Sequence, residues 1–559
     1  MLNKLIEKQW LVQLLIVAFA SLLFVPFIGN MHLFDWDEIN FAESAREMLV
    51  SHNYLTVQID FKPFWEKPPL FIWFQVLSMK LFGINEFAAR FPNAMCGVFT
   101  LLSVYNHGKK LYDSKFGLTW VLMYSCSILP YLYFKSGIID PWFNLFIFNG
   151  VAFFVYYIQE LTERSGNARQ IRFLIISAIF IGLAVLTKGP VAFLIFCIAL
   201  VVFVLLIRFK MQIKPLHVLI YLAMFSFVGG FWFIVQWLTG HGSVIMDFIQ
   251  YQIRLFTTQD AGHGGFLLYH FVVLLLGVFP SSVFALPLLL KILPANPLQV
   301  LFQRWMIILF WTVLILFTIV KTKIVHYSSL CYFPITFLAA LFVYSVEMKS
   351  YAPKKWVRTL QIIFGGLIAV VAIALPFIAM NISWVLKKGW VDDAFAAGNM
   401  QAAVHWSGFE SSAGVILLVG LLLYAIYSLR NTMVAHRILL FSSLVCVTLL
   451  TLMVTPRIEG YSQRAAIEFL EDVSTKNARA YAVDYFSYAP LFYAKRPPSD
   501  NPKVYDMDWL LQGDLDQDTY FIVKVDQLAA NKEKYPTLQF LYEKNGFVFL
   551  MRKAIKNDK

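Results

Sequence analysis

The fold of this chain is decided by a polar stretch at residues 34–69, which reads FDWDEINFAESAREML at 34–49 and FKPFWEKPP at 61–69. It lies between an apolar run at 10–29 and a long series of apolar segments that follow it. Carboxylates beside a membrane are unfavourable unless they face water or take part in chemistry. The many acidic side chains of this stretch therefore indicate a functional region that faces water.

The composition indicates a polytopic membrane protein. Of the 559 residues, 59% are apolar and only 14% are charged, which is more hydrophobic than a soluble protein of this length. The net charge of +12 comes from the first 455 residues, where 31 Lys and Arg face 19 Asp and Glu; the remaining residues have 15 of each. The basic residues form short runs between apolar segments, a pattern that reports topology. We therefore expect no nucleic-acid partner.

The apolar segments predict about thirteen transmembrane helices. The run at 10–29 is long enough to span a membrane and lacks a small-residue cleavage site, so we expect a signal anchor. The further spans are expected at 87–106, 116–134, 138–158, 172–187, 189–207, 216–238, 266–290, 305–320, 325–346, 357–379, 412–429 and 438–455.

Two juxtamembrane helices are expected in the first outer loop, residues 30–86. The apolar side chains of residues 40–50 share one face, which predicts an amphipathic helix at the membrane interface. The run at 70–82 follows two prolines and ends at Gly83, so it predicts a second helix. This helix would reach roughly 20 Å, short of the roughly 30 Å hydrocarbon core. We expect it to lie on the membrane.

The basic runs predict the orientation of the chain. With a cytoplasmic N-terminus, the even-numbered connections carry these runs, as the positive-inside rule requires. They comprise Lys109, Lys110, Lys115, Arg164, Arg169, Arg172, Arg208, Lys210, Lys214, Lys349, Lys354, Lys355 and Arg358. The acidic stretch, the loops at 240–265 and 380–411 and the C-terminal tail then lie outside. We expect a bacterial inner-membrane protein with its chemistry on the periplasmic side.

The composition changes near residue 456, which predicts two domains. Residues 1–455 are expected to form a transmembrane catalytic domain, and 456–559 a small α/β periplasmic domain. In the tail we expect a helix at 461–473 and strands near 479–484, 503–506 and 519–525. An Asn-Gly pair at 545–546 predicts a hairpin turn between two apolar strands.

Several ionisable residues lie at the outer ends of predicted spans, where charges are candidates for function. They are Asp140, Lys188, Arg254, Lys321, Lys323, His326 and Tyr327. The alternative is that such side chains are anchors that extend toward the membrane surface, which explains Arg90 and Lys135. Asp37 and Glu38 open the helix of the acidic stretch, where a helix-capping role is the alternative.

If these outer ends converge, two carboxylates, Asp37 and Asp140, meet a set of cations. Lys67, Lys188, Arg254 and Lys321 or Lys323 suit a lipid-linked phosphate with a sugar attached, because ammonium groups neutralise the charge on a phosphate leaving group. A carboxylate would deprotonate or orient the acceptor. The sequence has no GxxxxGK loop, which argues against nucleotide hydrolysis.

A divalent cation is a further option, held by Glu66 and His263. A structural role for His263, hydrogen-bonded within a glycine-rich loop, is the alternative. We expect no other cofactor.

The order of the motifs resembles a known family. DWDEINFAESAREML, FWEKPPLFIW, LFGINEFAARFP, SGIIDPW, LTKGP and KTKIVHYSSLCYFP follow one another along the chain. In this order they resemble the bacterial aminoarabinose lipid A transferases and the protein O-mannosyltransferases, which are polyprenyl-phosphate-dependent glycosyltransferases of the GT-C superfamily. The resemblance covers the membrane part and, more weakly, the tail.

This resemblance implies an all-α GT-C membrane fold and sugar transfer from an undecaprenyl phosphate donor, with inversion. It implies that lipid A or another glycan or lipid is the acceptor and that an aminoarabinose-like pentose is a candidate sugar. Asp37 would be the principal catalytic carboxylate within the acidic pair that Glu38 completes, and Asp140 the second acid. The remaining implied roles are donor phosphate contact for Lys67, cavity lining for Lys188 and Tyr327, and metal binding for Glu66 and His263.

One position departs from the family. Its members often have Arg-Tyr where this chain has Asn40-Phe41, and a lost cation would weaken or relocate phosphate contacts. The role of Asp37 also stays open: a phosphate acceptor near neutral pH needs no base, whereas a hydroxyl acceptor does. The alternative function is a transporter or flippase for a lipid-linked sugar, but the charges crowd one face and no inverted repeat is visible.

Overall fold

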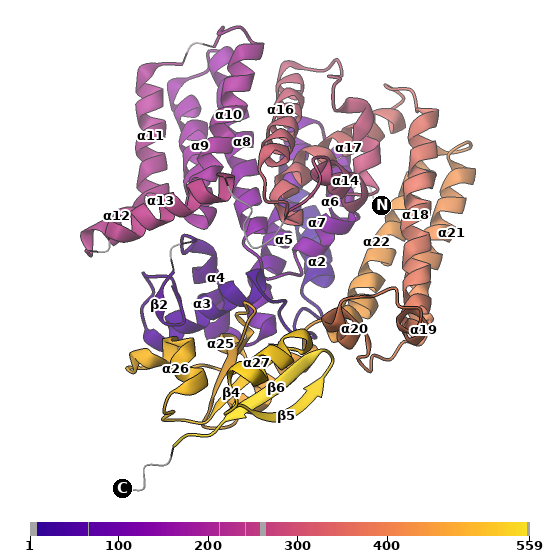
Figure 1. Cartoon of the computed structure of the whole chain (residues 1–559). Coiled ribbons are helices and arrows are strands. Elements are labelled where there is room, and N and C mark those ends of the chain that lie inside the picture. The colour runs from indigo at the N-terminus through magenta and orange to yellow at the C-terminus, as the bar shows by residue number, and fades with distance from the viewer. Residues whose placement is uncertain (1–7, 65, 212, 241, 258–263, 556–559) are drawn as a thin grey trace.

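The computed structural model describes residues 8–64, 66–211, 213–240, 242–257 and 264–555. Most of them form a bundle of α-helices, and a small sheet with short helices lies at one end of the bundle (Figure 1). The helices of the first outer loop, α3 (Asp37–Ser51) and α4 (Leu70–Phe82), lie at that same end. Short strands β1 (Gln58–Ile59) and β2 (Lys62–Pro63) pair between them.

Among the described residues, eight helical segments are long and apolar enough to cross a membrane. They are Glu86–Leu111 (α5), Asp140–Thr162 (α8), Asn167–Lys188 (α9), Pro297–Ile319 (α16), Val325–Glu347 (with α17, Tyr332–Glu347), Lys355–Met380 (α18), Phe409–Tyr427 (with α21, Ser412–Tyr427) and Thr432–Gly460 (with α22, Thr432–Leu449). Two bent pairs raise the number to as many as ten: α11 (Pro215–Gly229) with α12 (Phe231–Leu238), and α14 (Tyr269–Gly277) with Ser281–Leu288. The multi-pass membrane character is thus confirmed.

The predicted number of thirteen spans is not confirmed, because three predicted segments form shorter helices. The first is α2 (Gln9–Phe24), and another is α10 (Val191–Leu206). The segment predicted at 116–134 divides into α6 (Ser114–Ser125) and α7 (Ile128–Tyr133). The backbone of Ser127 is extended, and Pro130 fits the first turn of the new helix, where its missing N–H leaves no hydrogen bond unmade.

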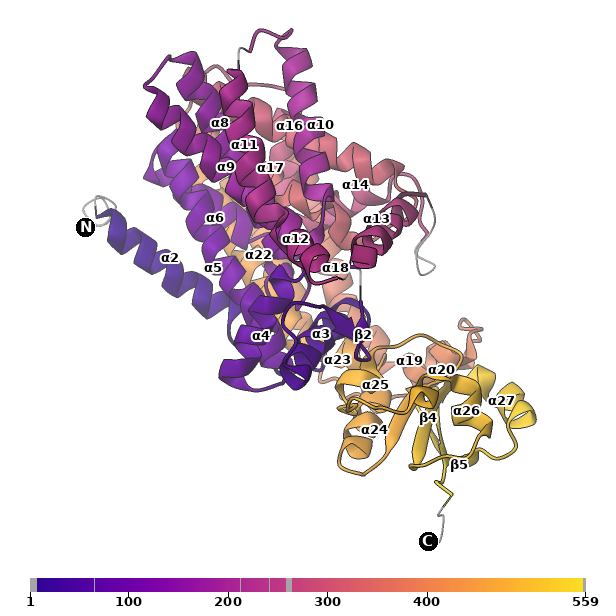
Figure 2. The same cartoon turned by 90° about the vertical axis from the view of Figure 1, so that its left-hand side faces the viewer.

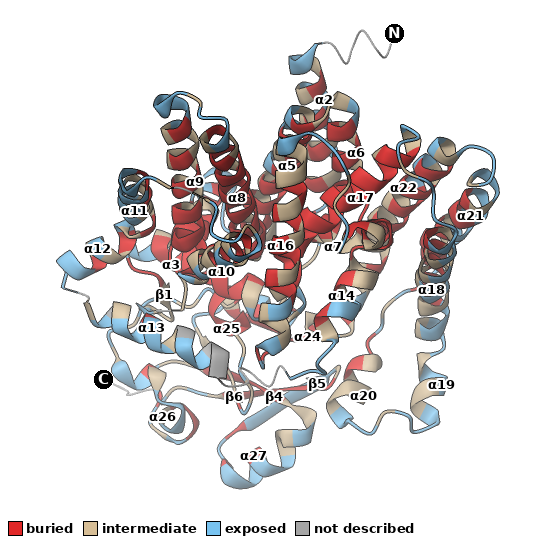
Figure 3. Ribbon diagram, turned by 90° about the horizontal axis from the view of Figure 1, so that it is seen from above, coloured by how far each residue is buried: buried red, intermediate tan, exposed pale blue. Residues whose placement is uncertain are grey.

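Burial differs strongly between the helices of the bundle (Figure 3). The apolar window of Val325–Glu347 is 94% buried and that of α8 is 89% buried, whereas that of α18 is 22% buried. Most residues of these two segments thus lie inside the protein. This arrangement gives their polar residues a protein environment in place of lipid.

The prediction for α3 was partly wrong. The helix forms, but every residue from Glu38 to Met48 is buried, so α3 is not a helix with one face open at the interface. It packs against α4 and against α25 (Ala489–Phe492) of the C-terminal region. The predicted bounds of α4 are confirmed: it ends before Gly83, whose φ of 81° suits glycine.

The C-terminal residues form a four-stranded sheet with the order β3-β4-β6-β5. Its strands are β3 (Arg479–Ala482), β4 (Thr519–Lys524), β5 (Gln539–Lys544) and β6 (Phe547–Arg552), and only the β3–β4 pair is parallel. The predicted hairpin is confirmed, with positive φ at both Asn545 and Gly546 as a type I′ turn requires. The predicted strand at 503–506 was wrong, because Pro502–Tyr505 form a 3-10 turn that Asn501 caps.

The sheet shares a hydrophobic core with the first outer loop. Ile39, Ala42 and Met48 of α3 lie in one buried cluster with Phe549 of β6 and with Leu470 of α24 (Arg464–Ser474). The C-terminal region is therefore docked on the loop that carries the acidic stretch, as Figure 2 also shows. The predicted domain boundary at 455/456 falls within the helical segment Thr432–Gly460 and stays a prediction.

Candidate functional site

A polar cavity of about 540 Å³ lies where the first outer loop meets the ends of the buried spans. Residues around the start of α3, the loop before α4, the start of α8 and the 3-10 turn Val325–Cys331 contribute to it, and so do Lys188 at the end of α9, Tyr251 and two residues of the C-terminal region. Its lining comprises Phe34, Asp35, Trp36, Asp37, Glu38, Asn40, Phe41, Glu66, Lys67, Ile138, Ile139, Asp140, Lys188, Tyr251, Ile324, His326, Tyr327, Phe486 and Tyr488.

The two predicted carboxylates meet at His326. Its Nε2 lies 3.4 Å from Oδ2 of Asp37 and 3.9 Å from Oδ2 of Asp140. Asp140 is the first residue of α8, and its Oδ1 pairs with Nζ of Lys188 at 2.5 Å. Asp140 is thus buried and neutralised, whereas the side chain of Asp37 is 45% exposed and available to a ligand.

Lys67 contributes a second cation to the cavity. Its Nζ lies 3.9 Å from Oε2 of Glu66, which also accepts a hydrogen bond of 2.9 Å from the hydroxyl of Tyr251. Burial lowers the pKa of Lys67, Glu66 opposes that shift and Lys188 adds to it. An anion that enters the cavity would favour the charged form of Lys67.

Glu38 lines the cavity, but its carboxylate is hydrogen-bonded to other parts of the protein. Its Oε1 accepts hydrogen bonds from Nε of Arg90 and the backbone N–H of Gly137, and its Oε2 accepts from Nη2 of Arg90 and the N–H of Phe34. Burial alone would raise the pKa of Glu38, but Arg90 and these N–H groups hold it below its usual value. Both carboxylate oxygens are occupied, so the geometry favours a positioning role over the predicted catalytic one.

The explanation of Arg90 and Lys135 as membrane-surface anchors was wrong. Arg90 is fully buried, and besides Glu38 it donates to the carbonyls of Ile28, Met31 and His32. Lys135 is 7% exposed and donates to the carbonyl of Pro26 at 2.9 Å. Both cations bind backbone carbonyls that follow α2.

Three predicted cations do not line the cavity. Nζ of Lys323 donates to the carbonyls of Phe317, Thr318 and Val320 and so caps the C-terminus of α16. Lys321 is exposed. Arg254 lies on α13 (Gly242–Thr257), 5.2 Å from the ring of Tyr251, and thus borders the cavity through that tyrosine.

The predicted metal site rests partly on His263, which lies outside the described residues. Within the described part of the chain, no three His, Cys, Asp or Glu side chains cluster in a way that could hold a metal ion. Glu66 is already bonded to Tyr251.

Sequence reasoning assigned no role to several lining residues. His326 stood out only as an ionisable residue at the end of a span, and its position between two carboxylates had no local signal. Phe486 and Tyr488 come from the C-terminal region, more than 400 residues after the acidic stretch. Oδ1 of Asp35 accepts a hydrogen bond of 3.0 Å from the N–H of Tyr488, and the rings of Trp36 and Phe486 lie 5.1 Å apart.

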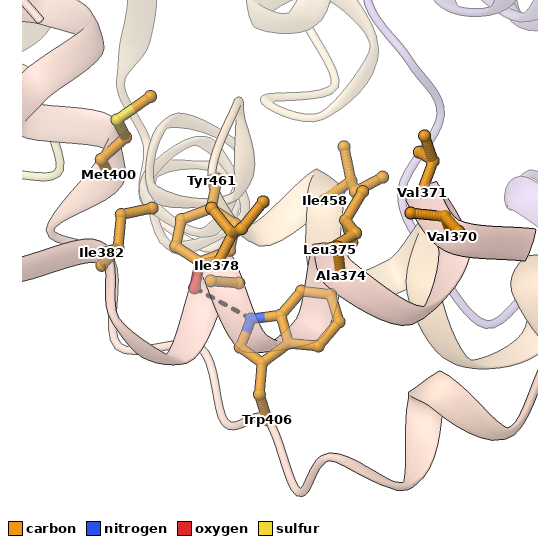
Figure 4. A pocket seen from close by; sticks show the side chains of 11 residues that line it. Val370, Val371, Ala374, Leu375, Ile378, Ile382, Met400, Trp406, Ile458 and Tyr461 are labelled. Carbon is orange, nitrogen blue, oxygen red and sulfur yellow. Dashed lines mark hydrogen bonds between the residues drawn. The ribbon is translucent and has the colours of Figure 1, made fainter. Parts of the chain in front are cut away.

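A second cavity of about 420 Å³ has a different character (Figure 4). Apolar side chains of α18, among them Val370, Leu375 and Ile378, form most of its wall. The lone hydrogen bond between its drawn side chains runs from Nε1 of Trp406 to the hydroxyl of Tyr461. It has no ionisable lining residue other than this tyrosine, so it does not compete with the polar cavity as a site of chemistry.

Comparison with known proteins places these observations in a family context. The family described as dolichyl-phosphate-mannose-protein mannosyltransferase matches residues 66–231. An undecaprenyl phosphate-alpha-4-amino-4-deoxy-L-arabinose arabinosyl transferase from Wigglesworthia glossinidia brevipalpis is 25% identical over 349 residues, which cover 60% of this chain and 59% of that protein. The protein of the same name from Serratia proteamaculans is 25% identical over 444 residues, 77% of this chain and 73% of that protein.

The fold is similar to that of ArnT from Cupriavidus metallidurans in the crystal structure with undecaprenyl phosphate. The TM-score is 0.78 at 18% sequence identity, and the match covers 97% of this chain and 98% of that one. The structure of the same protein in the apo state gives a TM-score of 0.74. These structural matches confirm the predicted fold, and the relatives named above confirm the predicted resemblance to aminoarabinose transferases.

Proposed function

Since the chain has the fold and the ordered motifs of the GT-C glycosyltransferases, we propose that it is an integral membrane enzyme that moves a sugar from a polyprenyl phosphate donor to lipid A or another envelope acceptor. The observation that supports this proposal most is the cavity that is lined by Asp37, Asp140, Lys67, Lys188 and His326. Aminoarabinose is the first sugar to test, because relatives are named for it.

The cations of the cavity suit the phosphate of the donor. In the transfer, the bond between the anomeric carbon and the phosphate oxygen breaks, and the acceptor oxygen forms the new bond from the opposite face. Negative charge then grows on the departing polyprenyl phosphate. Among the described residues, Lys67 pairs with Glu66 at 3.9 Å, a looser pair than that of Lys188 with Asp140 at 2.5 Å, so Lys67 is the cation placed to neutralise this charge.

The carboxylates suit the acceptor. Asp37 is the more exposed of the two, and His326 fixes its orientation. For a hydroxyl acceptor, Asp37 takes the proton as general base; for a phosphate acceptor it orients the nucleophile. Asp140 pairs with Lys188, and it lies 3.9 Å from the same His326 nitrogen that approaches Asp37. We therefore assign Asp140 a positioning role.

The orientation in the membrane is part of this proposal. In Figure 1 the connection between α10 and α11 lies at the end of the bundle opposite the C-terminal sheet, and it carries Arg208, Lys210 and Lys214. A cytoplasmic location of this connection places the cavity, the acidic stretch and a small C-terminal α/β domain of residues 456–559 on the periplasmic side.

The test is transfer by the purified full-length protein, with undecaprenyl phosphate-4-amino-4-deoxy-L-arabinose as donor and lipid A as acceptor. We expect Asp37→Asn and Lys67→Ala to abolish the product while size-exclusion profile and unfolding temperature stay those of the wild type. Lys321→Ala is the matched control, because this lysine is exposed and is not among the residues that line the cavity. Normal transfer by Asp37→Asn would overturn the proposal.

Mass spectrometry of lipid A and other envelope glycans, from cells with and without the protein, identifies the sugar and the acceptor. A missing sugar on one acceptor names both substrates. An unchanged envelope combined with altered export of a lipid-linked sugar would instead favour the flippase alternative.

A further inference from the structure

Trp36 has a backbone conformation that is unfavourable for a large side chain. Its φ of 74° and ψ of −106° lie outside the regions that residues other than glycine ordinarily adopt. Such strain persists only where the surrounding structure enforces it, and it clusters at functional sites. Trp36 directly precedes Asp37 and lines the same polar cavity. The strain at Trp36 therefore points to a role in this cavity.

The C-terminal region fixes this conformation through Asp35. Oδ1 of Asp35 accepts hydrogen bonds from the backbone N–H of Trp36 at 2.8 Å and from the backbone N–H of Tyr488 at 3.0 Å. The N–H of Asp35 donates to Oε1 of Gln463 at 3.0 Å. Gln463 and Tyr488 lie 428 and 453 residues after Asp35 in the chain. The turn before α3 is thus held by contacts from the C-terminal region.

The indole of Trp36 gains too little burial to explain the strain. Trp36 is 42% exposed, and Phe486, whose ring lies 5.1 Å from it, is 56% exposed. Tyr488 is 7% exposed, and its ring lies 6.4 Å from that of Trp36 and 4.8 Å from that of Phe486. Tyr488 thus supports two aromatic side chains that line the cavity and keep much of their surface exposed.

Exposed rings together with charged groups suit a sugar. The C–H groups on one face of a sugar stack on the electron-rich face of an aromatic ring, and its hydroxyl or amino groups bind carboxylates and ammonium groups. The cavity offers both kinds of partner, because Asp37 is 45% exposed and Lys67 and Lys188 also line it. A phosphate alone would need only the cations, and a polyprenyl chain alone would need only the rings.

We propose that Trp36 and Phe486 form an aromatic subsite that binds a sugar ring in the cavity by stacking, and that the C-terminal region holds this subsite in place. The inference rests on the proposed function and adds the recognition of the sugar to it. The sugar belongs either to the donor or to the acceptor. The strain at Trp36 follows from the need to present an indole directly beside Asp37.

Two variants of Trp36 test the subsite. The full-length protein in lipid nanodiscs is titrated with undecaprenyl phosphate and with undecaprenyl phosphate-4-amino-4-deoxy-L-arabinose. For a contact with the donor sugar, we expect Trp36→Ala to bind the bare lipid phosphate as the wild type does and the sugar-loaded lipid about 5- to 10-fold more weakly. Trp36→Phe keeps an aromatic ring and should recover most of this loss. Trp390→Ala is the control, because Trp390 is also exposed but does not line the cavity.

A contact with the acceptor leaves both donor affinities unchanged. In that case the KM for lipid A should rise about 5- to 10-fold in Trp36→Ala and return toward the wild-type value in Trp36→Phe. Trp36→Gly tests the strain, because glycine adopts a positive φ without steric cost. We expect Trp36→Gly to unfold at a higher temperature than Trp36→Ala and to show the same loss of affinity.

Equal losses for both lipids would assign Trp36 to the phosphate or the polyprenyl chain and overturn the inference. Unchanged donor affinities with an unchanged KM for lipid A would also overturn it, as would a loss in Trp36→Phe equal to that in Trp36→Ala. An unfolding temperature of Trp36→Gly below that of Trp36→Ala would contradict the strain from which the inference starts. Failure of the wild type to bind either lipid would instead overturn the proposed donor class, so the two failures are distinguishable.

Discussion

At the scale of single residues, the site depends on two lysines with different surroundings. Lys188 is bound to Asp140 at 2.5 Å, whereas within the described part of the chain Nζ of Lys67 pairs with Glu66 at 3.9 Å and lies 5.1 Å from the ring centroid of Tyr251. The first lysine therefore fixes a carboxylate, and the second is available to a ligand. This division of roles follows from tertiary contacts, because Asp140 lies 48 residues before Lys188 in the chain.

The lowered pKa of Lys67 predicts a pH dependence of donor binding. Burial disfavours its ammonium form, so the proton is lost below the ordinary lysine pKa, and affinity for undecaprenyl phosphate should fall as pH rises. From about pH 7.5 to about pH 10 the phosphate itself is already ionised, which isolates the lysine. In Lys67→Arg the guanidinium stays charged, and the affinity should be flat. Titration calorimetry in nanodiscs measures both; an equal slope in the two proteins would contradict the assignment.

Asn40 and Arg90 are two residues whose contacts could not be predicted from the sequence. The departure at Asn40 was visible as a lost cation, but its unpaired amide oxygen required the folded structure. Arg90 lies in an apolar span, a pattern typical of a surface anchor, yet it pairs with Glu38 in the preceding loop. Only the return of the chain from α3 to α5 makes this buried ion pair possible.

At the scale of elements, α3 connects the membrane part to the C-terminal sheet through buried charges. Arg46 donates to both oxygens of Glu43 at 2.6 Å and to the carbonyl of Arg496 at 2.8 Å. Arg496 in turn pairs with Asp60 at 2.9 Å. The helix therefore positions Asp37 at its first residue while its other side is fixed to the C-terminal region.

Arg46→Met should loosen this connection. The change leaves Glu43, which is fully buried, without its cation, and breaking a buried pair in this way destabilises by about 3–5 kcal/mol. We expect faster limited proteolysis of the C-terminal region and reduced transfer, although Arg46 does not line the cavity. Lys476→Ala is the control: its pair with Asp472 is exposed and worth at most about 1 kcal/mol. Equal protease resistance of Arg46→Met and the wild type would show that the sheet docks through its apolar core alone.

Element bounds were predictable where the chain carries a local signal. Two prolines and Gly83 define α4, and Asn545-Gly546 defines the hairpin, because these residues restrict or permit backbone angles by themselves. The division of the predicted span at 116–134 was not predictable from hydropathy, since a break in the middle of an apolar run leaves its composition unchanged. Because such breaks cannot be read from composition, the number of membrane-spanning helices was harder to predict than the positions of the apolar segments.

At the scale of the whole molecule, the cavity is completed by residues from both ends of the chain. Asp37 and Lys67 come from the first outer loop, His326 from the middle of the chain, and Phe486 and Tyr488 from the C-terminal region. The predictions identified the contributions of the loop, since that stretch combines acids, a lysine and prolines beside a membrane. They could not identify the aromatic pair, because it lies in a segment whose composition is that of an ordinary soluble domain.

The aromatic pair leads to the last prediction. The ring of Phe486 lies 5.1 Å from Trp36 and 4.8 Å from Tyr488, so it joins the C-terminal region to the residue that precedes Asp37. It is 56% exposed, and its removal should therefore leave the fold intact. We expect Phe486→Ala to raise the KM of donor or acceptor about 5- to 10-fold, as for the loss of one aromatic contact, with an unchanged unfolding temperature. Phe486→Tyr retains the ring and should restore the KM, and Phe540→Ala, an exposed aromatic on β5 away from the cavity, is the control. If Phe486→Ala transfers sugar with the wild-type KM for both substrates, then the C-terminal region supports α3 but takes no part in substrate binding.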